Sequence, residues 1–173
     1  MPHGSTMAAE PVLLALAQVA VVAVGFASIF RLFSVGNLSA ATAVEIAGLR
    51  FIVDHGIASF FFSILPLVLF YALFDERMAI GISSGLLYMA LVLDMILNCR
   101  RLVLLTQAGS GPRRPNVFLY VFFPVTFVVA LLCASNLVFW RATGPYLVGI
   151  LWLLANAFIQ FLHFVYPPPE ESS

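Results

Sequence analysis

Charged residues are scarce in this sequence, and lysine does not occur at all. Only 9% of the 173 residues are charged, and the eight basic residues, all arginine, are balanced by eight acids. Ordinary soluble domains carry about 25% charged residues. With no net charge, the chain offers no basic surface of the kind that binds nucleic acid. We therefore expect neither an ordinary soluble domain nor a nucleic-acid partner.

Cysteine and catalytic motifs are equally sparse. The two cysteines, Cys99 and Cys133, fall on different hydrophobic segments, which argues against a disulfide framework or a thiolate metal site. The sequence contains no HExxH or CxxCH motif and no phosphate-binding glycine loop. These absences favour a protein that is not an enzyme.

Long hydrophobic runs dominate what is present. The chain is 62% hydrophobic, with a mean hydropathy of +1.06. A helix that spans a bilayer needs about 20 apolar residues, and five segments reach that length. We predict an all-α integral membrane protein, a single membrane domain over 1–173 with a disordered tail at 167–173. Its five transmembrane helices are expected at about 12–33, 45–74, 78–101, 117–139 and 145–166.

The arginines predict an orientation, because short cytoplasmic loops carry an excess of basic residues. One side of the predicted topology holds six arginines, namely Arg31, Arg50, Arg100, Arg101, Arg113 and Arg114. The other side holds Arg77 and Arg141. The prediction is an outer N-terminus and a cytoplasmic C-terminus, with Arg100, Arg101, Arg113 and Arg114 on the lipid headgroups. Abundant Arg, Ala, Leu and Val without lysine suggest a GC-rich bacterial genome, hence a bacterial inner membrane.

Small residues and closely spaced polar pairs predict packing, capping and ion-pair contacts in the second and third helices. Gly81, Ser84 and Gly85 form a small-residue face suited to close helix packing, within the chain, in a homo-oligomer or in a larger membrane complex. Thr42 and Glu45 have the spacing of a capping box at the start of the second helix. Arg50 and Asp54, four residues apart, are expected to form an ion pair at the membrane interface.

Polar residues in the apolar segments recur at helical spacing. Asp94, Asn98 and Arg101 share one helix face, and Asn156, Gln160 and His163 share another. Such faces avoid lipid, and counting from segment midpoints puts His55 at a similar depth. We therefore predict a polar cluster on the cytoplasmic side of the bundle, made of His55, Asp94, Asn98, Asn156, Gln160 and His163.

Three hypotheses explain this cluster. The first is a hydrogen-bonded network that holds the helices in register, as in a structural or accessory membrane component. The second is a proton or ion conductor that uses Asp94, since carboxylates inside a membrane often mark ion paths. The third is an electron-transfer anchor with haem b between His55 and His163, or a metal ion held by His55, Asp94 and His163. The first is the main prediction.

Overall fold

The computed structural model describes residues 7–34, 43–73, 75–107 and 117–165, and nearly all of them are helical. The helices are α1 (Glu10–Ser34), α2 (Ala43–Leu73), α3 (Glu76–Gln107), α4 (Val117–Ser135), the π-helical turn η2 (Asn136–Trp140) and α5 (Thr143–Val165). The described residues contain no strand. Each of the five α-helical segments supplies a stretch long and apolar enough to cross a membrane, the fourth with η2 included. The all-helical prediction is confirmed at this level.

The helix ends have local causes. Asp75 caps α3, because its Oδ1 accepts hydrogen bonds from the backbone N–H groups of Arg77 and Met78 at 2.9 and 3.3 Å. Pro11 occupies the first turn of α1, where its missing N–H costs nothing. The apolar span of the third helix is Glu76–Arg100, close to the predicted 78–101, and the helix itself continues to Gln107. The apolar residues after Arg101 explain the extension, since they can prolong one helix face.

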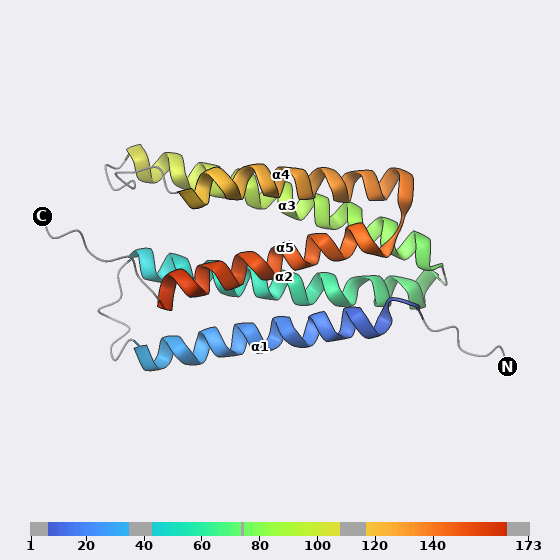
Figure 1. Cartoon of the computed structure of the whole chain (residues 1–173), viewed down its shortest axis with the longest axis horizontal. Helices are drawn as coiled ribbons and strands as arrows, with labels where there is room; N and C mark the ends of the chain where they lie inside the picture. Colours follow the sequence, from blue (N-terminus) through green and yellow to red (C-terminus); the bar gives the residue numbers. More distant parts are fainter. Residues whose placement is uncertain (1–6, 35–42, 74, 108–116, 166–173) are drawn as a thin grey trace, which may run out of the picture. The chain divides into compact units, whose positions relative to one another are not determined.

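The chain forms two compact units, and the first combines α1, α2 as far as Val68, and α5 from Ile150 onward. Figure 1 shows α1 and α2 running antiparallel, with this part of α5 alongside α2. Ala27, Ile52 and Ala157 form a small buried core, one residue from each helix, and Phe161 packs against it. Gly56 lies so close to Val24 that an added Cβ would collide with it. Glycine here lets α1 and α2 approach closely.

The second unit runs from Leu69 to Gly149 and contains α3, α4, η2 and the start of α5. In this unit α3 and α4 lie side by side and antiparallel (Figure 1). The buried side chains of Leu87 and Cys133 both lie against Gly149 in α5. Pro66 in α2 and Pro124 in α4 lie within continuous helices.

Candidate functional site

A buried polar face follows α2 through the first unit. His55, Ser59 and Ser63 are spaced four residues apart, so they lie on one helix face, and all three are buried. The Ser63 hydroxyl donates to the Ser59 carbonyl oxygen at 2.8 Å, one turn earlier. Serine side chains in an apolar environment commonly bond to the preceding turn in this way. The face is polar in composition, and part of its hydrogen bonding stays within α2.

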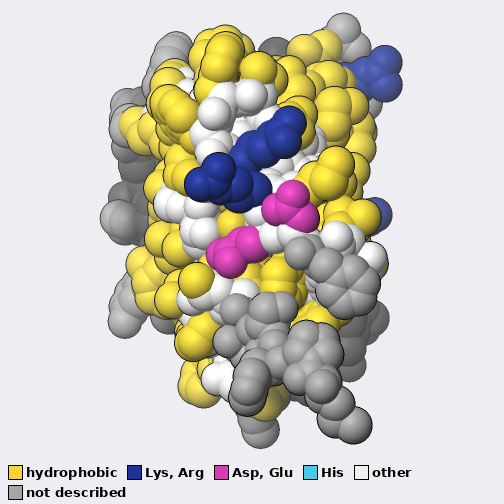
Figure 2. All heavy atoms as spheres, turned by 90° about the vertical axis from the view of Figure 1, so that its right-hand side faces the viewer, with side chains coloured by type: hydrophobic (Ala, Val, Ile, Leu, Met, Phe, Trp, Pro, Cys, Tyr) yellow, Lys and Arg dark blue, Asp and Glu magenta, His cyan; other side chains and the backbone are white. Residues whose placement is uncertain are grey.

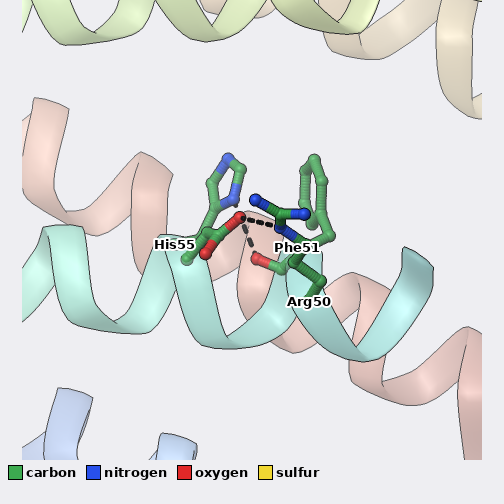
Figure 3. A network of polar contacts seen from close by, with 4 residues as sticks. Arg50, Phe51 and His55 are labelled. Atoms are coloured by element: carbon green, nitrogen blue, oxygen red, sulfur yellow. Dashed lines mark hydrogen bonds and ion pairs between the residues drawn. The ribbon is translucent and has the colours of Figure 1, made fainter. Parts of the chain in front are cut away.

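The His55 ring is fixed by the turn that precedes it. Its Nδ1 lies 3.0 Å from the Phe51 carbonyl oxygen, and the two rings are stacked with centroids 3.8 Å apart (Figure 3). Because a carbonyl oxygen can only accept, Nδ1 carries the proton and donates. In the neutral ring, Nε2 then has the lone pair that a hydrogen-bond donor or a metal could use.

Beside His55, Arg50 and Asp54 form an ion pair on the outer side of α2. Arg50 Nε lies 3.6 Å from Asp54 Oδ2 (Figure 3). The side chains are 71% and 55% exposed, so the pair is well outside the buried polar face. Of the capping box expected at the start of this helix, Thr42 lies outside the described residues, as does the side chain of Glu45.

Several buried polar side-chain atoms have no hydrogen-bond partner within the described part of the chain. Three of them are Ser59 Oγ and Asn156 Oδ1 in the first unit and Asn98 Nδ2 in the second. Leaving such an atom unpaired costs about 1 to 3 kcal/mol, so each marks a place where a water molecule or ligand would add stability.

The residues of the predicted cluster are divided between the two units. His55 and Asn156 are buried in the first unit, where Gln160 is half-buried; Asp94 and Asn98 are half-buried in the second. His163 belongs to α5, but its side chain lies outside the described part. Among the side chains that the structure describes, no three His, Cys, Asp or Glu residues are grouped to hold a metal ion. The haem and metal hypotheses depend on His163 and stay predictions.

The most complete polar site lies in the second unit, at Asn136, a residue that the sequence patterns did not single out. Its Nδ2 donates to Ser84 Oγ on α3 at 2.7 Å and to the Ala142 carbonyl oxygen at 3.0 Å, and its Oδ1 accepts from the Ala142 N–H at 2.9 Å. Asn136 is fully buried. One side chain thus joins α3 to the turn before α5. The only sequence signal is an asparagine late in an apolar segment, just before turn residues.

The turn around Asn136 packs on small residues of α3. Arg141 has a left-handed backbone conformation with φ 47°, and its N–H donates to the Asn136 carbonyl oxygen at 2.8 Å. An added Cβ at Gly81 would lie 3.3 Å from Arg141 Cγ, and one at Gly85 would lie 3.0 Å from Leu137 Cδ2. Gly81, Ser84 and Gly85 therefore all face η2 and its turn.

Charged side chains gather at the end of the second unit that holds this turn. Asp75, Glu76 and Arg77 begin α3, and Arg141 lies between η2 and α5. Figure 2 looks onto this end and shows basic and acidic groups among hydrophobic side chains. Of the arginines predicted to meet headgroups, Arg100 is exposed; Arg113, Arg114 and the Arg101 side chain lie outside the described part.

The first unit also contains an apolar cavity of about 630 Å³ between α1 and α5. Its walls include Val22 and Phe26 from α1 and Phe158 and Phe161 from α5, with Gln18 as the polar lining residue. This volume is within the range of small-molecule pockets. The chain matches no known family model, no curated protein and no solved structure.

Proposed function

We propose that this chain is an integral membrane protein with its N-terminus outside and its C-terminus in the cytoplasm. The five apolar helices support insertion, and the six-to-two division of arginines supports the orientation. Arg100, Arg101, Arg113 and Arg114 then meet anionic headgroups. The absence of lysine favours a bacterial inner membrane.

Within that membrane, the proposed role is that of a structural or accessory component. The observation that carries this proposal is the Asn136 site. Its three hydrogen bonds all stay within the protein: the bond to Ser84 joins residues 52 apart in the sequence, and the other two close the turn to Ala142. Ser63 and His55 likewise bond to their own helix. Polar groups used in this way hold helices in register, as the first sequence hypothesis requires.

Insertion and orientation can be tested in a Cys99→Ser background, with the buried Cys133 retained, by adding one cysteine either at the start of α3 or in the segment after α3. Arg77→Cys should react with a membrane-impermeant maleimide in intact cells, and Ser110→Cys only after lysis. The reverse pattern would overturn the orientation. Extraction of the protein by alkaline carbonate would overturn insertion itself.

A second candidate function is proton or ion conduction through Asp94. The unpaired buried atom Asn98 Nδ2 favours it, because Asn98 follows Asp94 by one turn of α3 and water in a polar path there would satisfy this atom. Proton flux into proteoliposomes separates the two proposals. If the role is structural, proteoliposomes should show the same proton flux as liposomes without protein. The substitutions Asp94→Leu and Gln160→Leu should then lower only the thermal stability. Flux that falls in Asp94→Asn would establish conduction instead.

A further inference from the structure

The outer face of α1 carries a regular stripe. Ala15, Gln18, Val22, Gly25 and Ile29 follow one another at spacings of three, four, three and four residues, and all are exposed. This alternation is the heptad pattern of helices that pack with a left-handed crossing. The opposite face of α1, which includes Leu13, Ala17, Ala20 and Ala27, is buried within the protein. Ala15, Gln18 and Val22 of the stripe also line the cavity between α1 and α5, so the stripe is an exposed face at the edge of that cavity.

Gln18 makes this stripe different from ordinary lipid-facing surface. It is exposed and makes no hydrogen bond with the part of the chain that the structure describes. In the apolar span from Glu10 to Ile29, Gln18 lies within two residues of the centre, or about 3 Å at 1.5 Å per residue. Once α1 is inserted, its amide is therefore at the middle of the hydrocarbon, where an unpaired polar group is expensive.

Lipid cannot satisfy this amide. The hydrocarbon core is about 30 Å thick, so the polar groups of phospholipids lie roughly 15 Å away from Gln18. A second amide that faces Gln18 can satisfy it, because a carboxamide is both donor and acceptor and two of them form a reciprocal hydrogen-bonded pair. Polar residues at a single core position of a heptad stripe are known to fix register and oligomeric state.

A second copy of the chain supplies that amide at the required depth. All copies insert in the same orientation, so a two-fold axis along the membrane normal pairs α1 with α1 in parallel. Gln18 then faces Gln18 at the axis. An added Cβ at Gly25 would meet nothing within 4 Å, which leaves room for close approach. The cavity that Ala15, Gln18 and Val22 line on one side offers further space for side chains of the second copy.

We infer that the chain forms a parallel homodimer through this α1 stripe, with the Gln18 amides paired across the two-fold axis at the bilayer centre. The inference rests on the proposed membrane insertion. It assigns α1 as the contact between copies, whereas Gly81, Ser84 and Gly85 of α3 already face η2 within the chain.

Neighbouring valines provide a matched test. Val22 lies on the stripe and is 65% exposed; Val21 is 54% exposed but about 100° away around the helix. In a Cys99→Ser background with the buried Cys133 retained, Val22→Cys should form a disulfide-linked dimer in isolated membranes, and Val21→Cys should react far more slowly. Adding Gln18→Leu should weaken dimerisation by roughly 3- to 20-fold, the factor expected for an interhelical side-chain hydrogen bond in a bilayer.

Each other outcome overturns the dimer. Equal linkage of both cysteines would mean random collision, a Val22→Cys monomer would mean that lipid covers the stripe, and linkage only to a different protein would identify a heterologous partner. Dimerisation unchanged by Gln18→Leu would remove the assigned contact. Carbonate extraction of the same samples separates these failures from failure of insertion, which would overturn the proposed function as well.

Discussion

Asn136 on η2 and Ser84 on α3 are joined by a hydrogen bond of 2.7 Å, although 52 residues separate them in the sequence. Both side chains are fully buried. The same Asn136 amide closes the turn to Ala142 through two further bonds. A single side chain therefore fixes both the packing of η2 on α3 and the path of the chain into α5.

Removing the Asn136 amide should be costly. Asn136→Leu keeps the volume but removes all three hydrogen bonds and leaves the part-buried N–H and C=O of Ala142 without these partners, so we expect a loss of about 2 to 3 kcal/mol of stability. Ser84→Ala should cost less, about 0.6 to 1.7 kcal/mol, because it removes one interhelical bond. Thermal unfolding in detergent measures both. Ser135→Ala is the matched control, since within the described residues the Ser135 hydroxyl bonds only to the Leu132 carbonyl oxygen in its own helix.

The two substitutions should also couple. If the Asn136 to Ser84 bond is the link between η2 and α3, the double variant should be more stable than the sum of the single losses predicts, by at least about 0.5 kcal/mol. Strict additivity, or an equal loss in Ser135→Ala, would show that the bond does not hold the two helices together.

Two glycines of α5 offer a paired test of packing. An added Cβ at Gly149 would lie 2.5 Å from Leu87 Cδ2 and 2.9 Å from Cys133 Sγ, whereas one at Gly144 would meet nothing within 4 Å. We expect Gly149→Ala to cost about 1 to 3 kcal/mol through overpacking. Gly144→Ala should be neutral or stabilising by up to about 1 kcal/mol. Similar midpoints for the two variants in thermal unfolding would contradict the close approach of α3, α4 and α5 at Gly149.

The ion pair between Arg50 and Asp54 should contribute little. Both side chains are mostly exposed and the N···O distance is 3.6 Å, so the pair is screened by solvent and headgroups. We expect Asp54→Asn to change the free energy of unfolding by less than about 0.5 kcal/mol. A loss above about 1 kcal/mol in the same detergent assay would mean that Asp54 has a further role in the assembled protein.

The sequence was sufficient to predict the five helices, because an apolar run of about 20 residues in lipid can satisfy its backbone only as a helix. It could not predict the Asn136 site. That site depends on a π-helical turn and on a left-handed residue, Arg141, which together return the Asn136 amide toward Ala142. Helical periodicity couples residues three or four apart, so it carries no information on a contact across 52 residues.

The burial of individual polar side chains could not be predicted from the sequence either. Helical spacing predicts which polar residues share a helix face. It does not predict that Asn156 is buried while Gln160, one turn later on the same face, is half-buried. How far a face is covered depends on the neighbouring helices and not on the face itself. The significance of Gln18 likewise emerged only when the structure showed which side of α1 is exposed.

The role of His55 can be decided by comparing two substitutions with different chemistry. His55→Phe retains a ring that can stack on Phe51, so we expect it to stay within about 1 kcal/mol of the parent. His55→Ala removes a buried ring and should cost about 2 to 4 kcal/mol. Under the structural role, the reduced-minus-oxidised absorption spectrum should show no band that depends on His55. A Soret band lost in both variants, including the stable His55→Phe, would contradict that role and establish His55 as a haem ligand, because phenylalanine can pack but cannot ligate iron.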